Sequence, residues 1–137
     1  MSDYNLVQRL PTVAEFLDLR RLSGLSAKTE EAAAAGLPNS RFAVVLEHDG
    51  VAIGMGRVIG DGGTAFQLTD IAVLPEHRGK GLGKRIVAAL VTWLEATAPK
   101  SAYISLIADG PAKDLYAQYG FKPTEEHGSI GMYLWLR

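Results

Sequence analysis

Cysteine is absent from the 137-residue chain. This absence excludes disulfides, thiolate metal sites and a cysteine nucleophile. The sequence also lacks any run approaching the roughly 20 apolar residues that a membrane helix needs. Its N-terminus has neither the basic start nor the apolar stretch of a signal peptide. We therefore expect a cytoplasmic protein with no membrane partner.

Neither sign of charge is in excess. The chain has 14 Lys and Arg against 15 Asp and Glu, for a net charge of -1. General nucleic-acid binding usually needs a basic imbalance, so we expect no nucleic-acid partner and, at most, a local basic patch. A hydrophobic fraction of 47% and a charged fraction of 21% fit a globular protein. The length fits a single domain over residues 1–137.

Apolar periodicity and turn residues predict a mixed α/β fold. The expected strands cover residues 3–10, 41–48, 51–59, 64–74 and 101–107, and the expected helices cover residues 12–24, 27–35, 82–97 and 111–119. Two C-terminal segments, FKPTEE and SIGMYLWLR, are expected to supply one or two closing strands. The prediction is a mostly antiparallel sheet of six to seven strands, with one parallel pair formed through a helical crossover.

A glycine-rich segment, HRGKGLG at residues 77–83, joins a strand to the longest helix. Gly79, Gly81 and Gly83 remove side chains there, so several backbone N–H groups can converge on one anion at the helix N-terminus. The basic side chains around it are Arg78, Lys80, Lys84 and Arg85. The spacing fits neither a P-loop nor a dinucleotide-binding GxGxxG motif. We expect a phosphorylated ligand; the alternative is an ordinary glycine-rich turn.

Two linked motifs point to a family. Arg78, Gly81 and Gly83 form the pattern R-x-x-G-x-G directly after a strand that ends in V-L-P, and LYAQYGF further on has the pattern L-Y-x-x-x-G-F. Together they resemble the GNAT superfamily of acyl-CoA-dependent N-acetyltransferases, over about residues 66–121. The resemblance implies the GNAT fold, with a splayed parallel strand pair and about four helices. It also implies acetyl-CoA as cosubstrate and no metal.

In such enzymes the loop amides hold the coenzyme A pyrophosphate, and the preceding strand pairs with the pantetheine arm. The resemblance therefore implies cofactor contacts from Ile71, Ala72, Val73, Arg78, Gly79, Lys80, Gly81, Leu82, Gly83 and Lys84. Tyr116 matches the family tyrosine that commonly protonates the departing thiolate, and a phenol is a hydrogen-bond donor at neutral pH. Tyr116 also shares a helical face with Leu115 and Tyr119, so a core aromatic is the alternative.

Asp70 is a second candidate catalytic residue. It shares an alternating strand face with Phe66 and Ala72. A carboxylate in apolar company needs a partner, and an incoming ammonium or its abstracted proton provides one. The alternatives are an ion pair with an arginine such as Arg57, or a carboxylate turned to solvent at a bulge.

The chain departs from the family pattern at Asp109, where many members have an asparagine near the coenzyme. Asp109 can still cap the following helix, but an anion is less favourable beside the cofactor. The three histidines, His48, His77 and His127, have no close metal-ligand spacing. We expect them at turns or on the surface.

The expected reaction is acetyl transfer from acetyl-CoA to a primary amine of a small molecule, by direct attack in a ternary complex. The alternatives are acetylation of a protein lysine or N-terminus, and a non-catalytic acyl-CoA sensor. In the family, the segment that contains Arg20 and Arg21 covers the acceptor site, so the resemblance makes them candidate acceptor contacts that would favour an acceptor with a carboxylate or phosphate; the alternative is a solvated helix face. The segment SIGMYLWLR is apolar on both faces; a homodimer is one explanation and burial under a helix is the other.

Overall fold

The computed structural model describes residues 3–136 of the chain. It contains two compact units, the first ending at Leu106 and the second beginning at Ile107. The first unit holds the sheet and three helices, and the second holds α4. The expectation of one domain over residues 1–137 stays a prediction.

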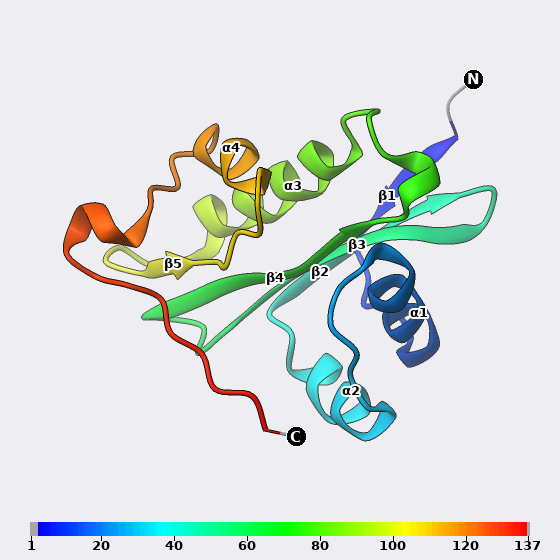
Figure 1. Cartoon of the computed structure of the whole chain (residues 1–137), viewed down its shortest axis with the longest axis horizontal. Helices are drawn as coiled ribbons and strands as arrows, with labels where there is room; N and C mark the ends of the chain where they lie inside the picture. The colour runs from blue at the N-terminus through cyan, green and yellow to red at the C-terminus, as the bar shows by residue number, and fades with distance from the viewer. Residues whose placement is uncertain (1–2, 137) are drawn as a thin grey trace. The chain divides into compact units, whose positions relative to one another are not determined.

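The first unit is built on a five-stranded sheet in the order β1-β2-β3-β4-β5 (Figure 1). The strands are β1 (Tyr4–Val7), β2 (Phe42–His48), β3 (Val51–Gly60), β4 (Ala65–Val73) and β5 (Tyr103–Ser105). Neighbours are antiparallel except β4 and β5, which are parallel as predicted. The expected count of six to seven strands is wrong for the described residues, because neither C-terminal segment forms a strand.

Helices cover both faces of the sheet. They are α1 (Val13–Ser23), α2 (Glu30–Gly36) and α3 (Leu82–Thr97), with α1 and α2 on one face and α3 on the other (Figure 1). The predicted capping box is present, since the side chain of Thr12 accepts from Glu15 N–H and Glu15 accepts from Thr12 N–H. Gly24 ends α1 with a φ of 91°. α2 starts later than predicted because the side chain of Thr29 accepts from the N–H of Ala32 and fixes its first turn.

Hydrophobic layers hold both sets of helices on the sheet. The buried cluster on the α1 and α2 face consists of Phe16, Leu19, Ala33, Leu37, Met55 and Ala72. On the other face α3 comes very close to β3 at Gly56, where an added Cβ would lie 2.5 Å from Cγ2 of Ile86. Any side chain at this position would push α3 away from the sheet.

A bulge interrupts β4 beside this crossing. The register between β3 and β4 shifts here, so that Asp70 and Ile71 lie opposite Gly56 alone. Asp70 adopts a left-handed φ of 57°. A bulge bends its strand and changes the direction of a side chain. The Asp70 carboxylate accordingly reaches Arg20 on α1.

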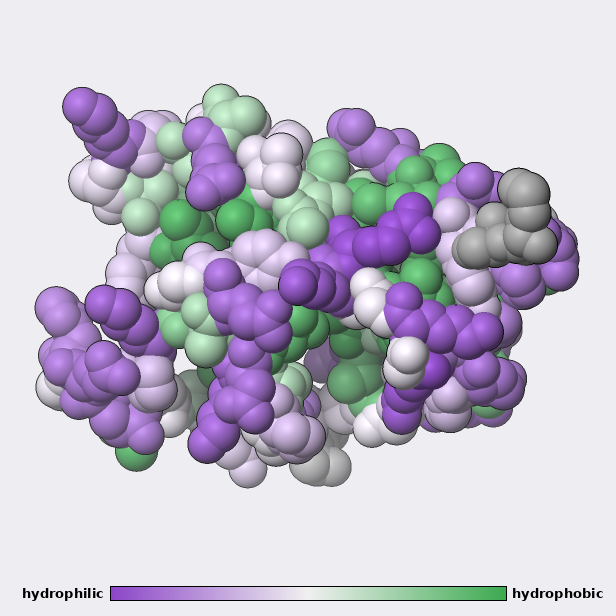
Figure 2. Space-filling model, turned by 90° about the horizontal axis from the view of Figure 1, so that it is seen from above, coloured by the Kyte–Doolittle hydropathy of each residue, from purple (hydrophilic) through white to green (hydrophobic). Residues whose placement is uncertain are grey.

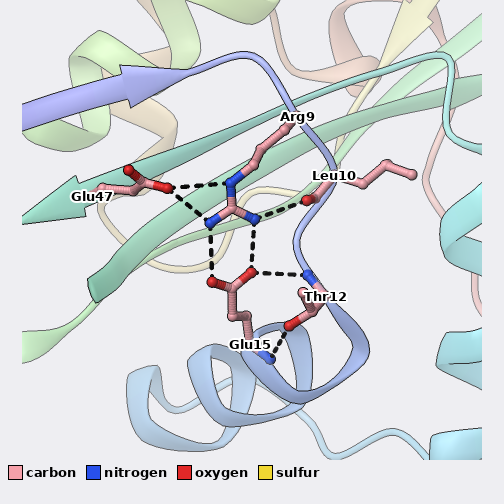
Figure 3. A network of polar contacts seen from close by, with 5 residues as sticks. All are labelled: Arg9, Leu10, Thr12, Glu15 and Glu47. Atoms are coloured by element: carbon pink, nitrogen blue, oxygen red, sulfur yellow. Dashed lines mark hydrogen bonds and ion pairs between the residues drawn. The ribbon is translucent and has the colours of Figure 1, made fainter. Parts of the chain in front are cut away.

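Arg9 ties the connection between β1 and α1 to the sheet (Figure 3). Its guanidinium donates to both carboxylate oxygens of Glu15, at 2.8 and 3.0 Å, and to Glu47 of β2 at 2.9 Å. It also donates to the carbonyl of Leu10 at 3.0 Å. The hydrogen bond from Arg9 is the main reason that the pKa of Glu15 falls to about 2. The same bond raises the pKa of Arg9 above its usual range.

The second unit contains α4 (Ala112–Ala117) and a short 3-10 turn (Thr124–His127). Pro111 precedes α4, and no side chain caps its first turn. The carbonyl of Asp109 accepts from the N–H of Ala112 at 3.1 Å. Asp109 therefore contributes its backbone, and the expectation of a side-chain cap is wrong.

Residues 129–136, called the C-terminal tail below, form no strand. Met132, Leu134 and Leu136 are 88, 86 and 89% exposed, and Tyr133 between them is 86% exposed. The apolar alternation is present, but these four side chains are not covered, so burial under a helix, one of the two explanations for the pattern, is wrong. A strand needs a hydrogen-bonded neighbour, and the second unit has no strand among its described residues to supply one.

Figure 2 views the molecule from above, where hydrophilic residues occupy much of the surface and hydrophobic ones are visible between them. Within residues 3–136 no helix combines the length and the apolar character needed to cross a bilayer.

Candidate active site

The glycine loop, residues 77–83, presents open backbone at the start of α3. Gly79 and Gly81 have φ values of 79° and 75°, a left-handed conformation that favours glycine. An added Cβ at either position would meet nothing within 4 Å, so these glycines face open space. The N–H of Arg78 donates to the carbonyl of Pro75 at 3.2 Å, and the N–H of Arg85 donates to the carbonyl of Gly81 at 3.1 Å. The amides between them lie at the positive end of a 16-residue helix, which suits an anion.

The side chain of Arg78 fixes the loop in place. Its Nε donates to the carbonyl of Val73 at 3.0 Å, and its Nη2 donates to the carbonyl of Ser23 at 2.9 Å. These bonds tie the loop to the end of β4 and to the end of α1. The ammonium of Lys80 lies 5.6 Å from the centre of the Tyr4 ring.

β4 offers an open edge just before the loop. One edge pairs with β3 along its length, whereas the pairing with β5 covers only Ala65, Phe66 and Gln67. Within the first unit as described, β4 therefore has no strand on its second edge from Leu68 onward. The predicted pantetheine contacts, residues 71–73, lie in this open part of β4.

Asp70 sits in a buried cluster with two arginines. Arg20 of α1 donates from Nη1 to Oδ1 at 2.5 Å, and Arg57 of β3 donates from Nε to Oδ2 at 2.7 Å. The side chains of Asp70, Arg20 and Arg57 are 4, 8 and 11% exposed. Both guanidinium groups lie over the ring of Phe16, at 5.7 and 5.5 Å from its centre. The predicted ion pair with Arg57 is confirmed; Arg20 is an additional partner.

Tyr116 lies on α4 in the second unit. It is 9% exposed and meets the Phe121 ring edge-on, with centroids 6.2 Å apart. Burial raises the pKa of the Tyr116 phenol, and the charge of Asp109 raises it further. The phenol is therefore protonated at neutral pH. The burial of Tyr116 fits a core aromatic residue. Its protonated phenol fits a proton donor.

Sequence reasoning missed an aromatic cluster beside the loop. The Tyr4 hydroxyl and Nδ1 of His77 are hydrogen-bonded at 2.6 Å. The Tyr4 ring also stacks on His48, with centroids 4.4 Å apart. No local pattern marks this cluster, because 73 residues separate Tyr4 from His77. Among the described residues no three His, Cys, Asp or Glu side chains gather as a metal-binding group.

A separate apolar groove of about 540 Å³ lies between α3 and the β1–β2 side of the sheet. Its lining includes Leu6, Phe42, Ala89 and Trp93, with Gln8 and Arg85. Among the described residues that line the groove there is no carboxylate or tyrosine, whereas the Asp70 cluster lies on the α1 face. We therefore place the candidate active site at the glycine loop and the open part of β4. Open backbone at a helix start, followed by free strand backbone, is typical of proteins that bind an extended, phosphorylated ligand.

Comparison with known proteins identifies the family. The model of the acetyltransferase (GNAT) domain matches residues 38–123 of this chain. The chain therefore belongs to the GNAT acetyltransferase family, which confirms the predicted resemblance. The match includes β4, the glycine loop and α4.

Solved and curated relatives agree with this assignment. A crystal structure from methicillin-resistant Staphylococcus aureus, described as a probable acetyltransferase of unknown function, is 45% identical. It covers 97% of this chain and 99% of its own, with a TM-score of 0.92. An aminoglycoside N-acetyltransferase in complex with CoA shares the fold at 19% identity, with a TM-score of 0.61 over 100% of this chain and 95% of that one.

Among curated proteins, the chloroplastic GCN5-related N-acetyltransferase 2 of Arabidopsis thaliana is 38% identical over 81 residues, 59% of this chain. The chain spans 30% of that protein and 25 to 33% of the other curated relatives it matches.

Proposed function

We propose that this GNAT acetyltransferase transfers an acetyl group from acetyl-CoA to a primary amine of a small molecule, by direct attack in a ternary complex. One observation carries the proposal. The left-handed Gly79 and Gly81 face open space at the N-terminus of α3, next to a part of β4 that has no strand on its second edge within the first unit as described. This arrangement suits a pyrophosphate followed by an amide-containing arm.

The loop would hold the diphosphate through its N–H groups, with the helix dipole adding attraction. The pantetheine arm would then add to the sheet beside Ile71, Ala72 and Val73, because its amides can pair with free strand backbone. In this pose the thioester would lie near the bulge of β4. Arg78 supports the pose indirectly, since it holds the loop on Val73.

Acetyl transfer needs a neutral amine, and the Asp70 cluster favours one. Two guanidinium groups against one carboxylate leave a net positive charge. A positive charge nearby lowers the pKa of an amine, because it disfavours the ammonium form. Both oxygens of Asp70 already accept from arginines, so we assign Asp70 the role of a positioning residue that holds Arg20 and Arg57.

Tyr116 is our proposed acid for the departing thiolate. Its raised phenol pKa keeps the proton in place at neutral pH, ready for donation. We expect Tyr116→Phe to lower kcat about 100-fold or more while the Kd for acetyl-CoA changes little, in the range typical of general acid catalysis. Unchanged turnover would remove Tyr116 from the reaction and leave it a core aromatic.

Acetyl-CoA binding can be tested with matched glycine variants. Gly81→Ala and Gly50→Ala both place a side chain at a φ near 75°, and neither Cβ meets an atom within 4 Å. Both variants therefore carry a similar backbone strain, but only Gly81 belongs to the loop. Calorimetry should give a clearly weaker Kd for coenzyme A in Gly81→Ala and a normal Kd in Gly50→Ala. Equal affinities in both variants would contradict the site.

Turnover requires a second measurement. Release of free thiol from acetyl-CoA, followed across a panel of small amines, peptides with lysine and peptides with a free N-terminus, should be fastest with a small amine. Transfer to peptides alone would favour the protein acetyltransferase. Tight coenzyme A binding without any transfer would favour the acyl-CoA sensor.

A further inference from the structure

The two arginines around Asp70 differ in how fully their donors are used. Each nitrogen of the Arg20 guanidinium has an acceptor: Nε donates to the Ser26 carbonyl, Nη1 to Asp70 and Nη2 to the Ser26 hydroxyl. Arg57 donates from Nε to Asp70 and from Nη1 to the Ser40 hydroxyl at 2.7 Å. Its Nη2 has no acceptor among the described residues. One nitrogen of the cluster is thus left to bind something else.

This nitrogen is not completely buried. Among residues 3–136, the fully buried side-chain nitrogen or oxygen that lacks a hydrogen-bond partner is Nδ1 of His48. Nη2 of Arg57 also lacks a partner but does not belong to the fully buried atoms. Arg57 is also the most exposed member of the cluster, at 11% against 8% for Arg20 and 4% for Asp70.

The net positive charge of the cluster favours the binding of an anion. Arg20 and Arg57 each carry one positive charge, and Asp70 is the one carboxylate that contacts them among the described residues. A net positive charge in a mostly buried site is costly unless it is paired. Arginine binds carboxylate and phosphate groups particularly well, because its planar donors match their oxygens.

The position of Arg57 connects this charge to the proposed reaction. Arg57 lies opposite Thr69, immediately next to the bulge formed by Asp70 and Ile71. Strands pair about 5 Å apart and rise about 3.3 Å per residue. Nη2 of Arg57 and a thioester beside Ile71 are therefore within the span of a small bifunctional molecule.

We propose that Nη2 of Arg57 binds an anionic group on the acceptor, so that the enzyme selects small primary amines that also carry a carboxylate or a phosphate. This inference rests on the proposed function, because the amine must react at β4. It transfers the anion-binding role expected for Arg20 and Arg21 to a residue of β3. Arg20 has its nitrogens engaged, and Arg21 is an exposed side chain paired with Asp18 at 3.2 Å.

Paired acceptors test the proposal directly. Short ω-amino carboxylates are compared with their carboxamides, and phosphoethanolamine with ethanolamine, by thiol release from acetyl-CoA. The anionic member of a pair should have a kcat/KM about 10- to 100-fold higher, as expected for a hydrogen-bonded charge pair. Arg57→Gln should bring that ratio close to one, whereas the exposed control Arg21→Gln should leave it unchanged. A preference for carboxylates or for phosphates identifies which anion the acceptor carries.

A measurement on the unmodified protein keeps the proposal testable if Arg57→Gln fails to fold. Inorganic phosphate is titrated while NMR follows the side-chain N–H signals of Arg57 and Arg21, with sodium chloride at equal ionic strength as reference. A saturable shift at Arg57 and none at Arg21 is expected. Absence of that shift, or equal kcat/KM for charged and neutral amines, would overturn the anion site and leave the acetyltransferase intact. Absence of coenzyme A binding would instead overturn the proposed function, and the phosphate titration would still decide the anion site.

Discussion

Replacing Asp70 with asparagine tests the buried cluster through stability. The carboxylate accepts from Arg20 and Arg57, and all three side chains are at most 11% exposed. Asparagine keeps the shape and one accepting oxygen, but its amide nitrogen cannot accept from the second arginine. It removes the charge that neutralises one guanidinium and leaves two buried positive charges beside each other.

The expected loss follows from this geometry. Removing one partner of a buried ion pair costs about 3 to 5 kcal/mol, because an uncompensated charge remains. The retained oxygen of asparagine places the estimate at the lower end, about 3 kcal/mol. For a chain of this length such a loss lowers Tm by about 10 °C.

Urea unfolding at neutral pH, followed by circular dichroism, measures the change. The matched control is Asp18→Asn, which breaks the ion pair with Arg21 on the surface, where the two side chains are 63 and 66% exposed. The control should change the free energy of unfolding by less than about 0.5 kcal/mol. A loss below about 1 kcal/mol for Asp70→Asn would refute the reasoning, because the carboxylate would then not be compensating the arginines.

Three further predictions concern the cap, the α3 crossing and the C-terminal tail. Since the pKa of Glu15 is lowered from 4.5 to about 2 in the folded protein, its contribution is present above pH 4.5 and lost as pH falls toward 2. Glu15→Gln should therefore lower the free energy of unfolding by about 1 to 2 kcal/mol at pH 7, after allowance for partial exposure, and by much less near pH 2; a constant difference would contradict this. Gly56→Ala forces Cβ against Ile86 and should destabilise by about 1 to 3 kcal/mol, whereas Gly63→Ala, whose Cβ has no atom nearer than 3.9 Å, serves as control. If the C-terminal tail pairs with a second subunit, sedimentation should give a dimer that Leu134→Glu weakens; a monomer for the unaltered chain would rule the homodimer out.

Local sequence determines much of the first unit, because the interactions involved span only a few residues. Thr12 and Glu15 form their capping box three residues apart, and Gly24 ends the same helix. The hairpin turn at Asp49 and Gly50 is a two-residue turn with left-handed φ values of 51° and 76°. The conformation of the glycine loop is also determined locally, because its left-handed φ values depend on glycine residues at these positions before a helix.

The number of strands could not be predicted from the sequence. Apolar alternation in the C-terminal tail is typical of a strand, yet a strand forms only where another strand pairs with it. The tail forms no strand, and the second unit has no strand among its described residues that could pair with it.

Only the tertiary structure decided the chemistry around Asp70. The sequence left its partner open between an ammonium, an arginine and solvent. The bulge opposite Gly56 turns the carboxylate toward Arg20, which is 50 residues away, and toward Arg57, which is 13 residues away. Contacts over such separations depend on strand register and helix packing rather than on spacing along the chain. The sequence by itself therefore determined the family and the glycine loop, and the packing of α1 on β3 and β4 determined which arginine keeps a free donor.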